Sequence, residues 1–316
     1  MEKAPKILVI TGPTATGKTA AGVLLAQELC GEVVSADSMQ VYRGMNIGTA
    51  KAGPEEMQGI PHHMLDVADP RENYSVARYV READACVQNI LSRGKLPVIV
   101  GGTGLYIDSL VLGRSFGEVS TDPALRSELS GHYDRIGGDA MLSELAQIDP
   151  ARAAKLHPAD KKRIVRALEV WRATGKTITQ HDEETRKLPP RYDAAMLALS
   201  FADRAALYRG IDARVDKMIA DGLFDEVRAL LASGVPDACT AMQAIGYKET
   251  VLALRGSLTM AEAADIIKRE SRRYAKRQLT WLRAKPALAW FHWGSSQNWS
   301  DFRQKSTQFL CSTGLK

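Results

Sequence analysis

Segments with strand-like and helix-like patterns alternate through the first hundred residues. Over residues 6–37 a short apolar run, a glycine-containing loop, a segment with helical apolar spacing and a second apolar run follow one another. At residues 74–100 a helical pattern again leads into an apolar run, LPVIV. Helices that alternate with short buried strands are typical of folds built on a parallel sheet. The pattern therefore predicts an α/β fold.

The middle of the chain has a different pattern. After Leu112, a stretch rich in glycine, serine and proline leads into helical segments near residues 124–133, 139–148 and 159–173, with no strand pattern among them. The strand-like run AAMLALSF follows only after the linker KLPPR. We therefore predict an inserted all-helical domain at 118–190, within a core formed by 1–117 and 191–316.

Long amphipathic helices are predicted to complete the core at residues 204–232 and 259–282. Residues 293–316 show little apolar periodicity. We therefore expect an irregular C-terminal tail.

Composition restricts the class of protein. The 316 residues are 45% hydrophobic and 25% charged, as in ordinary globular proteins. No apolar run approaches the roughly 18 residues that cross a bilayer, and the first twelve residues lack the apolar stretch of a secretory signal. The four cysteines lie far apart, which argues against a zinc site and against a disulfide framework. We expect a cytoplasmic protein with no membrane contact.

Positive charge is concentrated near the C-terminus. The formal net charge of the chain is +5, whereas residues 268–285 alone contain eight basic residues and one acid, a net charge of +7. This concentration suits a polyanionic partner, and a solvated helix face balanced by acids elsewhere is the alternative.

A phosphate-binding motif lies between the first predicted strand and helix. The loop GPTATGKT matches G-x-x-x-x-G-K-[ST] and consists of Gly12, Pro13, Thr14, Ala15, Thr16, Gly17, Lys18 and Thr19. In such a loop the backbone N–H groups face a phosphate, Lys18 adds a positive charge and the Thr19 hydroxyl can bind a phosphate-bound Mg²⁺. The core is therefore predicted to be similar to P-loop NTPases.

The acid that usually supplies a second metal contact in phosphoryl transfer is not evident. The strand LPVIV runs into Gly101 and Gly102 rather than into an acid. The first acid at the end of a predicted strand is Asp37, and parallel sheets bind ligands beyond the carboxyl ends of their strands. We predict that Asp37 faces the phosphate site, as a general base, as a Mg²⁺-organising carboxylate or as a helix cap.

Seven sequence blocks are spread along nearly the whole chain. They are GPTATGKT, ADSMQVYRGMNIGTAK, PHHMLDV, VGGTGLY, KKRIVRALEVWRATGK, AIGYKE and RRYAKRQLTWLR. In this order the blocks resemble the bacterial tRNA dimethylallyltransferase family, and the blocks DSMQVY and GGTGLY at these separations are the specific part. The resemblance implies a core similar to nucleotide kinases and a helical insertion that grips the tRNA anticodon stem-loop.

The resemblance also implies a reaction. A dimethylallyl group passes from dimethylallyl diphosphate to N6 of the adenine on the 3′ side of the anticodon, in tRNAs that read codons beginning with U. Diphosphate then leaves from the phosphate loop, with Mg²⁺ as cofactor. Asp37 is the candidate acceptor of the N6 proton. Arg214 matches a family arginine that meets the donor diphosphate, with an ion pair to Asp221 or Asp225 as the alternative.

The RNA contacts that the resemblance implies fall in three segments and two single positions. They are Asp37, Ser38, Met39 and Gln40; Thr103; Arg126; Lys162, Arg163, Ile164, Val165 and Arg166; and Ile245, Gly246, Tyr247 and Lys248. The family has glutamine at the position of Lys162, which puts a specific base contact there in doubt. Arg269, Arg273 and Arg277 recur on one helical stripe and extend the predicted phosphate-binding surface. A solvated surface is the alternative for each basic residue.

Three other functions have sequence features in their favour. A small-molecule kinase with the same first forty residues is the first, and an adenylate isopentenyltransferase that makes free cytokinin is the second. The helical insertion and the basic helices count against the second. The third is a nucleotide-switched RNA-binding protein, which needs no base at Asp37. We expect a monomer, and we expect no shared metal site at His62 and His63, because adjacent residues of an extended segment point to opposite sides.

Overall fold

The computed structural model describes residues 4–114 and 122–316. Contacts divide the chain into two compact units. Met1–Gly113 with Arg191–Lys316 form the first, which we call the sheet unit, and Arg114–Pro190 form the second, the helical unit. The predicted domain boundary between residues 117 and 118 lies outside the described residues.

The described residues of the sheet unit form one six-stranded parallel sheet with the strand order β3-β2-β4-β1-β5-β6. Leu8 of the central strand pairs with Val98 on one side and with Ala195 on the other. The predicted α/β fold with a parallel sheet is confirmed. The strands are β1 (Lys6–Thr11), β2 (Gly31–Ser35), β3 (His62–His63), β4 (Leu96–Val100), β5 (Asp193–Phe201) and β6 (Ala289–Trp293).

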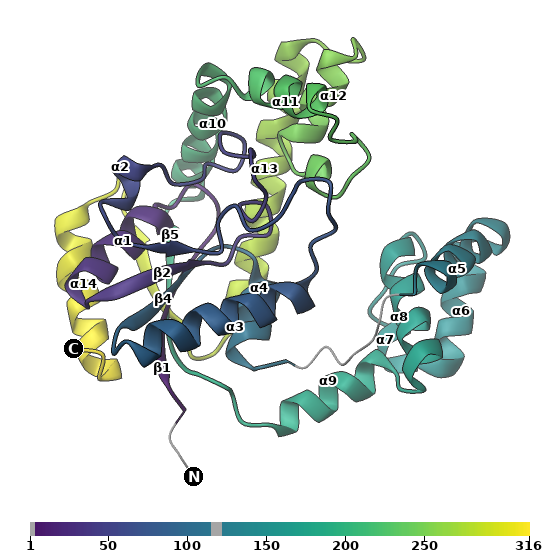
Figure 1. Ribbon diagram of the computed structural model, residues 1–316, viewed down its shortest axis with the longest axis horizontal. Helices are drawn as coiled ribbons and strands as arrows, with labels where there is room; N and C mark the ends of the chain where they lie inside the picture. The colour runs from purple at the N-terminus through teal and green to yellow at the C-terminus, as the bar shows by residue number, and fades with distance from the viewer. Residues whose placement is uncertain (1–3, 115–121) are drawn as a thin grey trace. The chain divides into compact units, whose positions relative to one another are not determined.

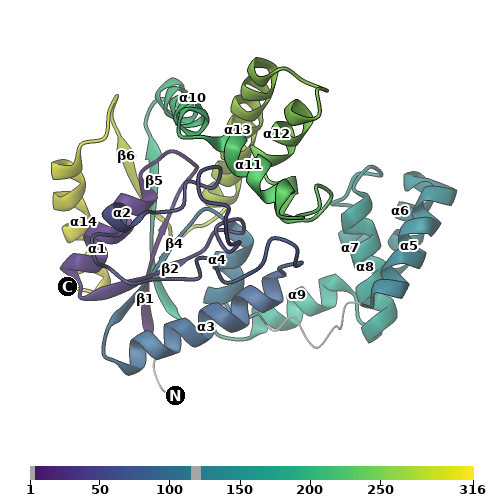
Figure 2. The ribbon, with the colours of Figure 1, turned by 45° about the horizontal axis from the view of Figure 1, so that its top comes forward.

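Helices cover both faces of this sheet. Figure 1 and Figure 2 show α1 (Lys18–Glu28) and α14 (Trp299–Thr313) on one face, and α3 (Val76–Ser92) and α4 (Gly104–Val111) on the other. The α1 face is closed by side chains without solvent exposure: Leu8, Leu25, Leu199, Phe302 and Leu310. Buried apolar surface of this kind is the main source of stability in such a layered fold.

The remaining helices of the sheet unit lie toward the carboxyl ends of the strands (Figure 1). They are α2 (Pro54–Met57), α10 (Arg204–Ala220), α11 (Leu223–Ala232), α12 (Tyr247–Leu254) and α13 (Met260–Arg283). The predicted single helix at 204–232 is two helices, because Gly222 adopts φ 103° between α10 and α11. Among the described residues, no helix has both the length and the apolar character needed to cross a bilayer.

The expectation of an irregular C-terminal tail is wrong. The tail contains α14, whose Phe302 and Leu310 are fully buried against the sheet. The Asn298 side chain accepts a hydrogen bond from the backbone N–H of Asp301 and so caps the helix. Because polar residues fill most positions between the few apolar ones, the sequence of α14 shows only a weak helical period.

The helical unit is built from α5 (Pro123–Ile136), α6 (Gly138–Ile148), α7 (Pro150–Ala153), α8 (Lys161–Thr174) and α9 (Ile178–Lys187). Its core contains Leu129, Met141, Leu145, Ile164 and Leu168, all nearly or fully buried. These residues recur every three to four positions along α6 and α8, which is why both helices bury one face.

Candidate active site

The phosphate loop joins β1 to α1 and surrounds a cavity of about 250 Å³. Residues 14–19 line this cavity, which we call the phosphate cavity, whereas Gly12 and Pro13 are not among its lining residues. The loop is held by internal hydrogen bonds, because Thr16 Oγ1 and Lys18 Nζ each donate to the Pro13 carbonyl at 2.8 Å. The predicted loop therefore has a fixed backbone at the N-terminus of α1, where a phosphate binds favourably.

Two cations and one carboxylate face the phosphate cavity. Lys18 and Arg214 are among its lining residues, together with Asp37. Burial and the nearby Arg214 lower the pKa of Lys18 to about 7, although Asp37 acts in the opposite direction. Burial likewise lowers the pKa of Arg214, against the influence of Asp37. A cavity in which burial makes positive charge costly gains the most from an anionic ligand.

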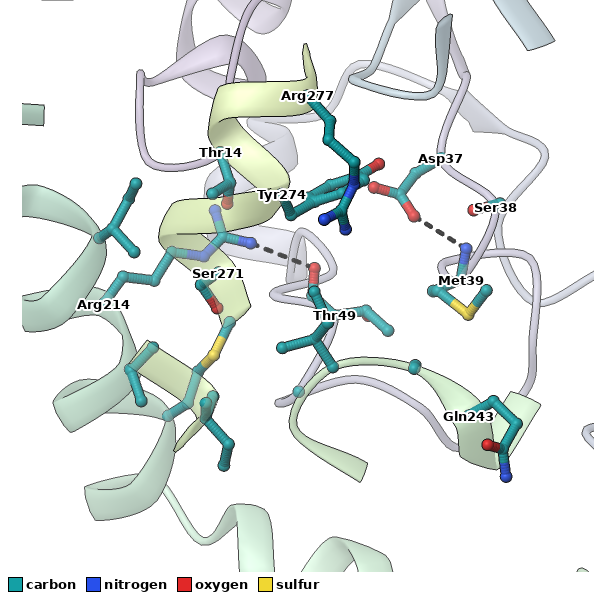
Figure 3. A pocket seen from close by; sticks show the side chains of 17 residues that line it. Thr14, Asp37, Ser38, Met39, Thr49, Arg214, Gln243, Ser271, Tyr274 and Arg277 are labelled. Carbon is teal, nitrogen blue, oxygen red and sulfur yellow. Dashed lines mark hydrogen bonds between the residues drawn. The ribbon is translucent and has the colours of Figure 1, made fainter. Parts of the chain in front are cut away.

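A second cavity of about 300 Å³ adjoins the first, and we call it the acceptor cavity. Four residues line both cavities: Thr14, Asp37, Arg214 and Tyr274. Figure 3 shows the Asp37 carboxylate beside Tyr274 and Arg277, which come from α13. One end of the acceptor cavity is apolar, with Ile211, Val215, Met218 and Ile267 among its lining residues. Asp37 thus lies where the two cavities meet.

The two oxygens of Asp37 have different surroundings. Oδ1 accepts hydrogen bonds from the backbone N–H groups of Met39 at 2.8 Å and Gln40 at 3.3 Å (Figure 3). Within the described part of the chain, no hydrogen bond reaches Oδ2. Asp37 therefore caps a turn on one oxygen, and the second oxygen remains available to a ligand. The alternative of a helix cap is wrong, because no helix begins directly after Asp37 in the described structure.

The loop after β4 supports Asp37 instead of supplying an acid. An added Cβ at Gly101 would lie 2.2 Å from the Ala36 carbonyl oxygen, so an aspartate does not fit there without a backbone shift. Thr103 Oγ1 accepts a hydrogen bond from the backbone N–H of Ser38 at 3.1 Å. The predicted contact residue Thr103 therefore fastens the turn that carries Asp37.

Arg214 makes a contact that the sequence did not indicate. Its Nη2 donates to the Thr49 carbonyl at 3.4 Å (Figure 3). Asp221 pairs instead with Lys217, and Asp225 pairs with Arg228. The alternative of an ion pair from Arg214 to either acid is wrong.

Sequence reasoning did not assign Tyr274 and Gln278 of α13 to this site. Gln278 Oε1 accepts from the Thr14 N–H, and its Nε2 donates to the Gly102 carbonyl, both at 3.0 Å. Burial and Asp37 raise the pKa of Tyr274 to about 12, so its phenol is neutral near pH 7. Ser271, Tyr274 and Gln278 follow helical spacing, and this polar face inside a basic helix was the available signal.

His62 was also not assigned to the site. It lines the phosphate cavity, and its Nδ1–H donates to the Ile60 carbonyl at 2.8 Å. Its buried Nε2 has no hydrogen-bond partner among the described residues, and burial lowers the pKa of the imidazole. His63 contacts Glu32 at 2.8 Å instead. The two imidazoles therefore contact different groups, which agrees with the prediction that they point to opposite sides.

Two family models match the sequence. An IPP transferase model matches residues 40–285, and an isopentenyl transferase model matches residues 5–72. The chain belongs to the IPP transferase family.

Named relatives and solved structures agree with this membership. A tRNA dimethylallyltransferase of Halalkalibacterium halodurans is 47% identical over 90% of each chain. One from Symbiobacterium thermophilum is 50% identical over 90% of this chain and 88% of its own. The crystal structure of a tRNA isopentenylpyrophosphate transferase from Bacillus halodurans has a TM-score of 0.73 at 42% identity, covering 98% of this chain and 96% of its own. A eukaryotic dimethylallyltransferase described as acting on tRNA has a TM-score of 0.81 at 29% identity, covering 96% of this chain and 77% of its own.

The predicted RNA-contact residues of the helical unit differ in exposure. Lys162 and Arg163 are exposed, whereas Ile164 and Val165 are buried in the core of this unit. Arg126 and Arg166 both donate at 2.9 Å to one oxygen of the fully buried Glu169. The side chains of Ile164 and Val165 therefore stabilise the fold and are not placed to contact RNA.

The residues of the segment 245–248 also differ in exposure. Ile245 lines the acceptor cavity, but Tyr247 is fully buried, and its hydroxyl donates to Glu226 at 2.6 Å. Gly246 is the N-cap residue of α12, and Lys248 is exposed. An RNA contact from Tyr247 would therefore have to come from its backbone.

The segment 37–40 lies in the site itself. Ser38 and Met39 line the acceptor cavity. Gln40 lines the phosphate cavity, where its Nε2 donates to the Thr49 carbonyl at 3.2 Å. Within this segment, Ser38 and Met39 line the acceptor cavity alone.

The phosphate cavity offers oxygen ligands suited to Mg²⁺. Thr19, Asp37 and Glu56 are among its lining residues, and hard divalent cations prefer hydroxyl and carboxylate oxygens. Among the described residues, no three His, Cys, Asp or Glu side chains lie close enough together to hold a metal ion. The residues fit a Mg²⁺ that is held chiefly by phosphate oxygens and water, as is usual for this ion.

Proposed function

We propose that this chain is a tRNA dimethylallyltransferase. It transfers the dimethylallyl group of dimethylallyl diphosphate to N6 of the adenine 3′ to the anticodon, in tRNAs that read codons beginning with U. The observation that carries the proposal is the position of Asp37, at the junction between a cationic phosphate cavity and a second cavity with an apolar end. The membership of the chain in the IPP transferase family supports the same activity.

In the proposed reaction, the donor C–O bond breaks and its electron pair leaves with diphosphate. The N6 lone pair forms the new C–N bond, and the N6 proton passes to Oδ2 of Asp37, the oxygen without a partner within the described residues. The adenine amine needs such a base because its lone pair is delocalised into the ring. The other oxygen of Asp37 holds the carboxylate in place through the backbone of Met39 and Gln40.

The phosphate cavity receives the diphosphate in this proposal. Lys18 and Arg214 stabilise the negative charge that grows as the C–O bond breaks, and they stabilise the transition state more than the ground state. A bound Mg²⁺, near Thr19, would supply further positive charge to the leaving group. The apolar end of the acceptor cavity provides a surface that suits the prenyl carbons.

RNA binding is assigned to exposed basic residues of both units. Lys162 and Arg163 on α8 and Arg277 on α13 are exposed, and Arg277 also lines the acceptor cavity. Phosphate contacts from such residues position an RNA, and contacts to unstacked bases give specificity. With the tRNA anticodon stem-loop as its partner, we propose that the chain acts in the cytoplasm as a monomer.

One incubation tests the activity against its alternatives. Pure protein, Mg²⁺ and labelled dimethylallyl diphosphate are mixed with unmodified tRNA or with AMP, and the label is located by nucleoside analysis. We expect label on N6 of one adenine next to the anticodon and none on AMP. Label on AMP would indicate an adenylate isopentenyltransferase instead. If neither acceptor is labelled and ATP is turned over with a metabolite, the chain is a kinase.

A further inference from the structure

Glu226, which lines neither cavity, binds a row of backbone amides. This residue of α11 accepts hydrogen bonds at Oε2 from the N–H groups of Asn46 and Ile47, at 2.8 and 2.7 Å. Its Oε1 accepts from the Gly48 N–H at 3.1 Å and from the Tyr247 hydroxyl at 2.6 Å. Consecutive amides that converge on one carboxylate form a strong, charge-assisted contact.

The segment that Glu226 holds is a wall of the candidate active site. Gly48 and Thr49 line the acceptor cavity, and Ala50 lines the phosphate cavity, whereas Glu226 lines neither. The Thr49 carbonyl accepts hydrogen bonds from Arg214 at 3.4 Å and from Gln40 at 3.2 Å. Glu226 and Arg214 therefore hold the same short loop from opposite ends of residues 46–49.

Packing leaves this loop little freedom to move toward α12. A Cβ added at Gly48 would lie 2.5 Å from the Tyr247 ring, which is fully buried. Burial and the Glu226 carboxylate raise the pKa of the Tyr247 phenol, so it remains a hydrogen-bond donor at neutral pH. The aromatic ring, the carboxylate and the loop thus form one rigid support.

We propose that Glu226 is a positioning residue for the donor. By holding residues 46–49 in place, it fixes the position of the Thr49 carbonyl, and this carbonyl orients Arg214 toward the diphosphate. This inference rests on the proposed function only for the identity of the diphosphate ligand. It also gives Tyr247 a defined role, which is to support Glu226 from the buried side. A loop released from Glu226 would leave Arg214 without its anchor, and the buried cation would then adopt several orientations.

The first test measures binding of inorganic diphosphate with Mg²⁺ to the full chain by calorimetry. Glu226→Gln removes the negative charge and turns an N–H₂ group toward backbone donors, so we expect diphosphate affinity to fall about tenfold. Affinity for tRNA should remain within twofold, because Glu226 lines neither cavity and binds only backbone amides and the Tyr247 hydroxyl in the described structure. Glu226→Asp keeps the charge and should recover part of the loss. Asp225→Asn is the matched control, since Asp225 lies on the same helix turn and pairs only with the exposed Arg228 in the described structure.

A double-mutant cycle tests whether the effect passes through Arg214. In an Arg214→Lys background the anchored guanidinium is absent, so Glu226→Gln should then change diphosphate affinity by less than twofold. If the loss of diphosphate affinity in the double variant equals the product of the losses in the two single variants, the proposal is wrong. It is also wrong if Glu226→Gln lowers the affinities for diphosphate and tRNA equally and lowers the melting temperature. If Glu226→Gln does not fold, Glu226→Asp takes its place in the same cycle with the same criterion. Because the readout is diphosphate binding, a chain that fails to prenylate tRNA would still give a decisive result.

Discussion

The phosphate loop and helix α8 were both predicted as runs of consecutive contact residues, but only the residues of the loop face one common site. Residues 14–19 line one cavity together. Of residues 162–166 on α8, two are exposed, two are buried and Arg166 is paired with Glu169. A phosphate loop binds mainly through its backbone, so neighbouring residues act together. A helix turns by about 100° per residue, so five consecutive side chains must point in all directions. A run of predicted contact residues on a helix therefore contains both residues that can reach a ligand and residues that pack in the core.

The strongest test of the loop is Lys18→Ala. Because this side chain is one of the two cations that line the phosphate cavity, we expect donor turnover to fall by about one hundredfold or more. Binding of tRNA, measured by filter retention, should persist. Lys217→Ala, which removes an exposed lysine paired with Asp221, is the control and should retain full turnover. Near-normal turnover of Lys18→Ala would mean that the loop does not stabilise the leaving diphosphate.

Asp37→Asn tests the junction between the two cavities. Asparagine keeps the size of the side chain and can still accept from Met39, but it cannot take a proton. We therefore expect the single-turnover rate to fall roughly one hundredfold, within the usual range for general base catalysis, while tRNA affinity barely changes.

A Mg²⁺ titration of the Asp37→Asn variant separates the two chemical roles. If the carboxylate organises Mg²⁺, a higher Mg²⁺ concentration should restore part of the rate, whereas a lost base cannot be restored in this way. A wild-type single-turnover rate at saturating donor and tRNA would leave Asp37 only the capping role seen at Oδ1.

The lowered pKa of Lys18 predicts proton uptake when diphosphate binds. Near pH 8 the free side chain, with a pKa of about 7, is mostly neutral, and an anion favours its charged form. Calorimetry in two buffers with different ionisation heats should then detect about one proton taken up, and affinity should weaken up to tenfold per pH unit above pH 7. At pH 6 the lysine is already charged, so this uptake should vanish. Lys18→Arg, always protonated, should lack it at both pH values; equal uptake by both proteins would assign the proton to another group.

Local patterns predicted most of the fold, and long-range contacts explain what they missed. The strands at 6–11 and 96–100 and the helix at 76–92 follow apolar periods that are visible in the sequence. The two-residue strand β3 exists only because it pairs with β2, and α14 is fixed by its contacts with the sheet. The site shows the same limit: Asp37 was predicted from its place after a strand, whereas Gln278 reaches the phosphate loop from 264 residues away. No period in the sequence records a contact of that kind.

The smallest expected effects are changes in the salt dependence of tRNA affinity, caused by substitutions of basic residues in the helical unit. They test which side chains of α8 contact RNA, as the Lys18→Ala variant tests the phosphate loop. Lys162 and Arg163 are exposed, and among the described residues the only ion pair that either makes is that of Arg163 with Asp160 at 3.8 Å. If both contact RNA phosphates, Lys162→Ala and Arg163→Ala should each reduce the slope of log affinity against log salt by about 0.7 to 0.9, without loss of stability.

Arg126→Ala and Arg166→Ala form the contrasting pair in the same unit. Each removes a partner of the buried Glu169, whose second oxygen already lacks one in the described structure. An under-satisfied buried carboxylate typically costs about 1 to 3 kcal/mol, so we expect lower thermal stability for this pair, whether or not the salt slope also changes. Melting curves and salt titrations of all four variants would separate the two pairs. Equal melting temperatures for the four variants would mean that the two arginines do not stabilise the buried Glu169. Unchanged salt slopes for Lys162→Ala and Arg163→Ala would mean that this face of α8 does not bind RNA phosphates.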